Sequence, residues 1–126
     1  MITVTKKFSF CYGHYLFGYS GKCKNIHGHN SEVEVEFTHN IDLPPAYTDM
    51  IIDFVDIKKH IEPILERFDH KLLNDQKDIF GDDEAPTAEN IVSKISKMIQ
   101  ETPIGPGLIR VRISETPTSW AEWRKD

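Results

Sequence analysis

Two stretches near the N-terminus alternate apolar and polar residues with a period of two, which is typical of strands with one buried face. In the first, Ile2 to Phe10, the even positions are apolar except for Lys6. The second, Ser31 to Phe37, sets two valines and a phenylalanine against three glutamates. We predict that these strands pair antiparallel. The stretch between them, Cys11 to Asn30, contains four glycines and is predicted to be a long loop, which in a compact domain is more often functional than idle.

Two segments in the second half of the chain have apolar residues at helical spacing. The first begins after Asp56, which we interpret as its N-cap, and its apolar positions continue to Phe68. Pro63 stands inside this pattern and is expected to kink or split the helix, because proline cannot donate the helical hydrogen bond. The second helix is predicted to start with Thr87 as N-cap and to end before Pro103.

A last strand is predicted from Leu108 to Glu115, with alternate positions from Ile109 to Ile113 on its apolar face. A turn containing Pro and Asp is expected at Asp42 to Pro45, before the first helix. The order of strands, then helices, then a strand predicts an α+β domain with the helices packed on one face of an antiparallel sheet.

Length and composition limit the class of protein. With 126 residues and 39% hydrophobic content, the chain fits one domain over residues 1–126. The net charge of −5 and the scattered lysines and arginines argue against nucleic acid as a partner. Because the sequence has no apolar run of about 20 residues and no secretory signal, we expect a cytoplasmic protein with no membrane partner and with free thiols.

Three histidines form a candidate metal site. His27 and His29 are separated by one glycine, so in an extended chain both side chains leave the same face. His14, at the end of the first predicted strand, would lie alongside if the strands pair. Three protein ligands with one open position are typical of catalytic zinc, and we predict a zinc ion here. The alternative is a polar turn with a surface histidine.

Cys23 lies four residues before His27 and is flanked by Lys22 and Lys24. A nearby dication and two lysines would favour its thiolate, the form that acts as nucleophile or general base. Two other interpretations stay open for this thiol: a fourth zinc ligand, or a buried loop cysteine. Cys11, which follows an aromatic strand residue, is interpreted as structural.

Two carboxylates have settings that fit a catalytic or binding role. Asp69 adjoins His70, and a carboxylate beside an imidazole can fix its tautomer for proton transfer, although an Asp-His pair at a helix end is also common as solvated charge. Glu115 shares parity with the apolar face of the last strand, where a buried carboxylate needs a partner. The paired N–H donors of a pterin or guanine ring would provide one. Alternatively, the strand ends at Ser114 and Glu115 is solvated.

Six segments together resemble, in order and spacing, the 6-pyruvoyl-tetrahydropterin synthase and 6-carboxy-tetrahydropterin synthase family. The resemblance spans nearly the whole chain, and its most specific parts are the Cys-x3-His-Gly-His block and the Asp-His-x2-Leu-Asn-Asp block. The matching segments are Phe10 to His14, Cys23 to His29, Asp53-Phe54, Asp69 to Asp75, Pro86 to Asn90 and Glu115 to Pro117.

The resemblance implies a tunnelling fold (T-fold), in which α+β subunits join their sheets into a barrel, as a homohexamer of two trimers with active sites at subunit interfaces. It also implies a role for each candidate residue. These are metal binding by His14, His27 and His29, catalysis by Cys23 with Asp69 and His70 from a neighbouring subunit, and substrate binding by Glu115 with Thr87, Ala88 and Glu89 close by.

The activity implied is that of a zinc-dependent lyase acting on the pterin triphosphate 7,8-dihydroneopterin triphosphate. We expect a 6-carboxy-5,6,7,8-tetrahydropterin synthase serving queuosine (7-deazapurine) biosynthesis. The alternatives are a 6-pyruvoyl-tetrahydropterin synthase, which eliminates triphosphate from the same substrate, and a non-catalytic pterin-binding paralogue. One departure concerns the pocket: Tyr12-Gly13 stands where the family commonly has Ala-Ala before its first zinc histidine.

Overall fold

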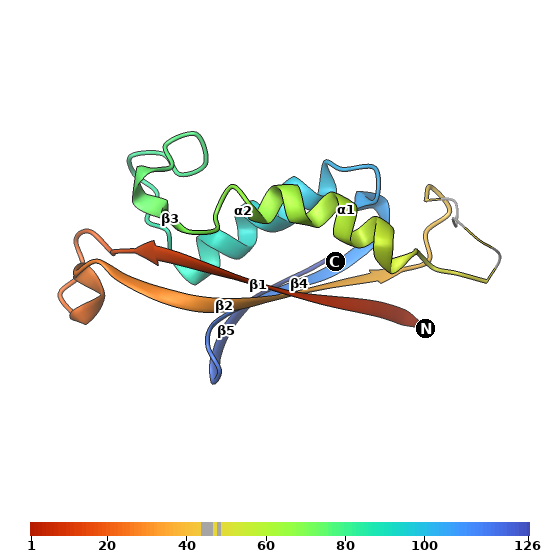
Figure 1. Cartoon of the computed structure of the whole chain (residues 1–126), viewed down its shortest axis with the longest axis horizontal. Helices are drawn as coiled ribbons and strands as arrows, with labels where there is room; N and C mark the ends of the chain where they lie inside the picture. The colour runs from red at the N-terminus through yellow and green to blue at the C-terminus, as the bar shows by residue number, and fades with distance from the viewer. Residues whose placement is uncertain (44–46, 48) are drawn as a thin grey trace.

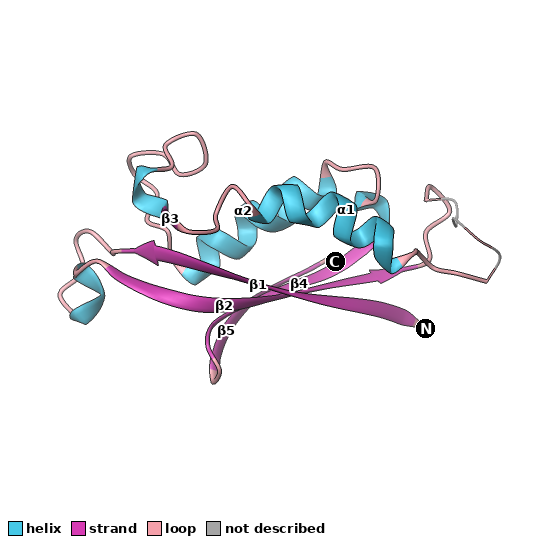
Figure 2. Ribbon diagram, in the orientation of Figure 1, coloured by secondary structure: helices cyan, strands magenta, loops and turns pink. Residues whose placement is uncertain are grey.

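A five-stranded sheet carries two helices on one of its faces in the computed structural model of this chain (Figure 1; Figure 2). The structure describes residues 1–43, 47 and 49–126, so the turn predicted at Asp42 to Pro45 lies partly outside the described residues. The strand order is β3-β1-β2-β4-β5. The elements are β1 (Thr3–His14), β2 (His27–Thr38), α1 (Phe54–Leu65), β3 (Lys71–Leu72), α2 (Ala88–Gln100), β4 (Leu108–Thr116) and β5 (Ser119–Arg124), with short 3-10 turns at Lys22–Lys24, Leu73–Asp75 and Gly105–Gly107.

Strands β1 and β2 pair antiparallel over their full length, from Thr3 opposite Thr38 to His14 opposite His27. The antiparallel pairing was predicted correctly, but the predicted loop from Cys11 to Asn30 was too long at both ends. The ladder continues through two facing glycines, Gly13 and Gly28, which interrupt the apolar alternation without interrupting the backbone hydrogen bonds.

The two faces of the sheet differ as the alternation predicted. Val33, Val35 and Phe37 are fully buried and belong to the same hydrophobic core as the buried isoleucines of α1 and α2. The opposite face carries charged pairs, and at its centre the Arg110 guanidinium reaches carboxylates on two neighbouring strands. Its partners are Glu36 at 2.6 Å, Glu122 at 3.1 Å and Glu34 at 3.3 Å. The apolar face is therefore the one that can enclose a buried site between sheet and helices.

Both predicted helices are present, with one correction at the start of the first. Asp53, not Asp56, caps α1, because its side chain accepts a hydrogen bond of 2.8 Å from the Val55 N–H. The helix is not split at Pro63: α1 continues through it, since a proline near the end of a helix removes only one late hydrogen bond. Thr87 caps α2 as predicted, accepting from the Asn90 N–H at 3.1 Å. Among the described residues, no helix is long and apolar enough to cross a membrane.

Strand β4 contains two irregularities that a simple alternation does not predict. Leu108 pairs with Phe37 and Arg110 with Glu36, so Ile109 is an extra residue and is only half-buried, not a member of the apolar face. Near the other end, Ser114 pairs with Trp120 and Thr116 with Ser119, which leaves Glu115 as an extra residue against β5. Such bulges re-aim a side chain, and the second one sets the direction of Glu115.

Candidate metal centre

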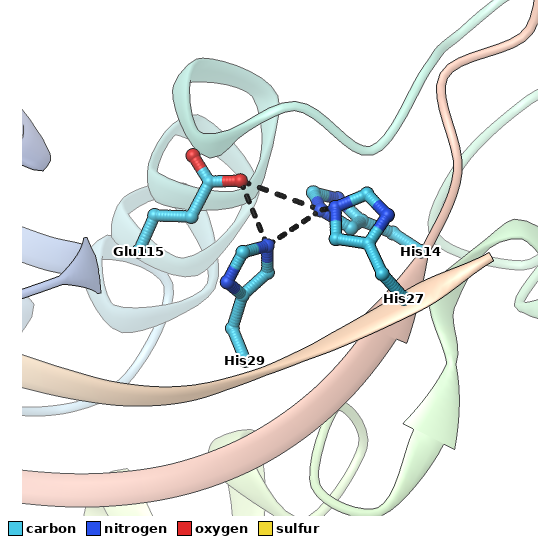
Figure 3. A group of neighbouring side chains, drawn as sticks. All are labelled: His14, His27, His29 and Glu115. Atoms are coloured by element: carbon cyan, nitrogen blue, oxygen red, sulfur yellow. Dashed lines mark hydrogen bonds and ion pairs between the residues drawn. The ribbon is translucent and has the colours of Figure 1, made fainter. Parts of the chain in front are cut away.

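Three imidazoles meet on the buried face of the sheet where β1 ends and β2 begins (Figure 3). His14 is the last residue of β1 and lies opposite His27, and His29 follows two residues later on the same face of β2. The Nε2 atom of His14 lies 3.0 Å from Nε2 of His27 and 3.1 Å from Nε2 of His29. The ladder register thus brings together three side chains that are up to 15 residues apart.

Hydrogen bonds to the backbone fix the orientation of two of these rings. Nδ1 of His14 lies 2.7 Å from the Pro86 carbonyl oxygen, and Nδ1 of His27 lies 2.7 Å from that of Asn25. Because a carbonyl oxygen only accepts, each Nδ1 carries the proton, and each Nε2 presents a lone pair to its neighbours. Burial lowers the pKa of His14, which is 1% exposed, and so favours its neutral form.

Glu115 completes the group from β4. Its Oε1 atom lies 3.0 Å from Nε2 of His29 and 3.4 Å from Nε2 of His14. The four ligand atoms all lie within 4.8 Å of one another. The alternative, in which the strand ends at Ser114 and Glu115 is solvated, is wrong for this chain, since the Glu115 side chain is only 28% exposed and points at the histidines (Figure 3).

The donor set fits a zinc ion. A tetrahedral zinc with Zn–N bonds of about 2.0–2.1 Å separates its ligand atoms by about 3.3–3.4 Å. The observed separations of 3.0 and 3.1 Å are close to this spacing. Two unprotonated nitrogens facing each other repel unless a cation lies between them, so the arrangement favours a metal ion over a simple hydrogen-bonded cluster.

Cys23 stays a predicted catalytic residue without a contact that assigns its role. It lies in the 3-10 turn between β1 and β2, and its carbonyl oxygen accepts a 2.7 Å hydrogen bond from the Leu16 N–H. In the part of the chain that the structure describes, its half-buried thiol is not a member of the four-residue metal group. Cys11 instead lies on the outward face of β1, with its thiol 3.0 Å from Oδ1 of Asn30.

The Asp69 carboxylate and the His70 imidazole are in contact near the outer edge of the sheet. Oδ1 of Asp69 lies 2.9 Å from Nδ1 of His70 and accepts a 2.9 Å hydrogen bond from the Cys11 N–H. This backbone bond, together with His70, lowers the pKa of Asp69. The His70 side chain is 80% exposed, and neither residue joins the histidine group of its own chain. The family resemblance implies that this pair acts in the site of a neighbouring subunit; within its own chain, His70 lines a second pocket together with His29.

A pocket of about 530 Å³ opens beside the metal group, between the start of α2 and the β4-β5 hairpin. Three predicted substrate-binding residues line it: Ala88, Glu89 and Glu115. The fourth, Thr87, adjoins this segment and uses its hydroxyl to cap α2. Sequence reasoning missed the tryptophans of β5, Trp120 and Trp123, which also line the pocket. The alternation of Ser119 to Arg124 was the available signal.

Comparison with known proteins agrees with this site and fold. The model of a family described as 6-pyruvoyl tetrahydropterin synthase matches residues 3–126. A relative from Archaeoglobus fulgidus, provisionally named a 6-carboxy-5,6,7,8-tetrahydropterin synthase, is 37% identical, with the alignment covering 93% of this chain and 90% of the relative. The 6-carboxy-5,6,7,8-tetrahydropterin synthase of Haemophilus influenzae is 31% identical, over 99% of this chain and 100% of that protein.

The fold matches a solved member of the same group. The structure of Caenorhabditis elegans 6-pyruvoyl tetrahydropterin synthase superposes with a TM-score of 0.82 at 25% identity, covering 99% of this chain and 96% of that one. The predicted fold class, a T-fold subunit with helices on one face of an antiparallel-rich sheet, is confirmed. On the family match over nearly its whole length, the chain belongs to the 6-pyruvoyl tetrahydropterin synthase family.

Proposed function

We propose that this protein is a zinc-dependent 6-carboxy-5,6,7,8-tetrahydropterin synthase that acts on 7,8-dihydroneopterin triphosphate in 7-deazapurine biosynthesis. The observation that carries the proposal is the convergence of three Nε2 atoms, two of them with their tautomers set by backbone carbonyls. The names of the two full-length relatives support the 6-carboxy product. Residues 1–126 would act as one pterin synthase domain.

His14, His27 and His29 would hold the zinc ion. The bound zinc would supply Lewis-acid chemistry, binding the hydroxyl groups of the substrate side chain and making them more acidic. His14 needs no deprotonation to bind a cation, because burial lowers its pKa and its Nδ1–H donates to the Pro86 carbonyl oxygen, which leaves Nε2 unprotonated. The chain thus presents its ligands in the form that a cation requires.

Glu115 would anchor the pterin ring. Its carboxylate lines the 530 Å³ pocket and lies at its border with the histidines, so a ring held there has its side chain next to the metal group. A carboxylate accepts two parallel N–H bonds from an aminopyrimidinone edge, which fixes the ring plane as well as its position. Ala88 and Glu89 of α2 would form the opposite wall.

Proton transfer would fall to Cys23 and the Asp69-His70 pair. Cys23 would take the carbon-bound proton as general base, and the exposed His70, oriented by Asp69, would complete the relay from a neighbouring subunit. We therefore propose a cytoplasmic homohexamer of two trimers with interface active sites. Light scattering should give a particle several times the 14.6 kDa chain mass, and a monomer at micromolar concentration would refute the shared relay.

A second candidate is 6-pyruvoyl-tetrahydropterin synthase activity, which is supported by the family description and by the superposition on the Caenorhabditis elegans structure. Both reactions need the same metal, base and relay. The products differ, because only the 6-carboxy reaction releases acetaldehyde.

The decisive experiment is incubation of the zinc-loaded protein with 7,8-dihydroneopterin triphosphate, followed by mass analysis of the products. We expect 6-carboxy-tetrahydropterin and acetaldehyde. A 6-pyruvoyl product without acetaldehyde would establish the second candidate. Recovery of unchanged substrate bound to zinc-loaded protein would identify a pterin-binding paralogue and refute both activities.

A further inference from the structure

Tyr12 lies against the histidine group without belonging to it. In the β1-β2 ladder it stands opposite His29, two residues before His14, on the same buried face. Its ring meets the His14 ring edge-on, with centroids 5.2 Å apart and an interplanar angle of 87°. It is tilted against His29 at 5.5 Å and stacks on Phe10 at 5.4 Å. The phenol ring therefore forms a wall of the compartment that contains the imidazoles.

The hydroxyl of Tyr12 has an environment that packing alone does not explain. The residue is 3% exposed, and its Oη atom is buried with no hydrogen-bond partner among the described residues. A phenol keeps its proton at neutral pH, so the hydroxyl is available as a donor. A buried donor without an acceptor is destabilising, and phenylalanine would fill the same space without that penalty.

Glu115 indicates where an acceptor would enter. Its carboxylate is engaged with His29 and His14, and it is the negative charge that acts on the Tyr12 hydroxyl. An oxygen-bearing ligand of the metal would lie beside the same three imidazoles. Beside the buried side chains of Tyr12 and His14, a hydrogen bond to such a partly charged oxygen is stronger than it would be in bulk solvent.

We propose that Tyr12 is a substrate-positioning residue, whose hydroxyl donates a hydrogen bond to the oxygen atom that a ligand places at the metal group. This inference rests on the proposed function, since it takes the ligand to be a pterin with an oxygenated side chain. Tyr12 then distinguishes pterins by that side chain, whereas Glu115 recognises the ring. The two residues divide recognition between the two ends of one ligand.

Binding titrations on the zinc-loaded protein test this division with two probes. One is 7,8-dihydroneopterin, which has hydroxyl groups on its side chain, and the other is 7,8-dihydropterin, which has no side chain. The Tyr12→Phe variant should bind 7,8-dihydroneopterin about tenfold more weakly, the effect of one lost hydrogen bond, and 7,8-dihydropterin as well as the wild type does. Tyr19→Phe, which removes a hydroxyl from a 55% exposed side chain, is the matched control and should change neither affinity.

Two further measurements separate a ligand contact from a structural role. Zinc content should stay unchanged in Tyr12→Phe, and the metal-free variant should melt at or above the wild-type temperature, because an unpaired buried hydroxyl has been removed. Equal weakening of both probes, loss of zinc, or unchanged binding of 7,8-dihydroneopterin would each overturn the proposal for Tyr12 alone. A wild-type protein that binds neither pterin would overturn the proposed function as well.

Discussion

Removal of the Glu115 charge should separate ring recognition from metal binding. Glu115 belongs to the four-residue group, with Oε1 3.0 Å from His29, yet it also lines the neighbouring pocket. The Glu115→Gln variant keeps the size of the side chain but replaces one carboxylate oxygen with an N–H donor that opposes the N–H donors of a pterin. If three imidazoles are sufficient for the metal, this variant should keep about one zinc per chain.

The expected loss of pterin affinity follows from the hydrogen bonds between the pterin N–H donors and the Glu115 carboxylate. A hydrogen bond to a charged group contributes about 1.5–3 kcal/mol, and about 1.4 kcal/mol corresponds to a tenfold change in Kd. Because the Glu115 side chain is 28% exposed, solvent screens the carboxylate, and we expect the lower end, a loss of about 10- to 30-fold.

Calorimetric titration with 7,8-dihydropterin and elemental analysis of the same preparation measure the two effects separately. Glu32→Gln is the control, since it removes one negative charge from an exposed pair with Lys7 on the opposite face of the sheet. If Glu115→Gln loses its zinc but the reloaded protein binds the pterin normally, Glu115 is a metal ligand and the ring is held elsewhere.

Two other predictions concern proton transfer and pH. Cys23→Ala should keep its zinc and its pterin affinity while turnover falls by roughly 10²- to 10⁴-fold, the contribution of a positioned base; normal turnover in a steady-state assay would assign proton transfer to Asp69 and His70 alone. The metal-free protein should lose stability as the pH falls below about 6.5, because burial lowers the pKa of His14 and the unfolded chain then binds a proton that the native chain does not. Melting temperatures between pH 7.5 and 5.5 test this, and a flat or inverted profile would contradict the assignment of a neutral, buried His14.

The period-two pattern predicted the buried face of β2 correctly because valine favours a buried position and glutamate a solvent-facing one. The same pattern failed at Gly13 and Gly28, since glycine has no side chain to report which face it occupies, and the ladder passed through both. Because of that error, the predicted strands ended too early, and the pairing of His14 with His27 in the ladder was not predicted.

Other features depend on partners that are distant in the sequence. The Pro86 carbonyl that fixes the His14 tautomer is 72 residues away in the sequence, and no residue near His14 indicates this hydrogen bond. Strand β5 was missed because one of its outward residues is Trp120, which is stabilised there by the Arg112 guanidinium, 3.6 Å from the centre of its ring. Glu115 was singled out by its parity, but the bulge that directs it becomes visible only when β5 is paired.

Zinc content in single histidine variants tests the central claim most directly. We predict about one zinc ion per chain in the purified protein, measured by elemental analysis after dialysis against a weak chelator. His14→Ala, His27→Ala and His29→Ala should each lose most of that metal, whereas His39→Ala, outside the group, should keep it. Full retention of zinc by His27→Ala and His29→Ala would contradict a metal centre built from these three imidazoles.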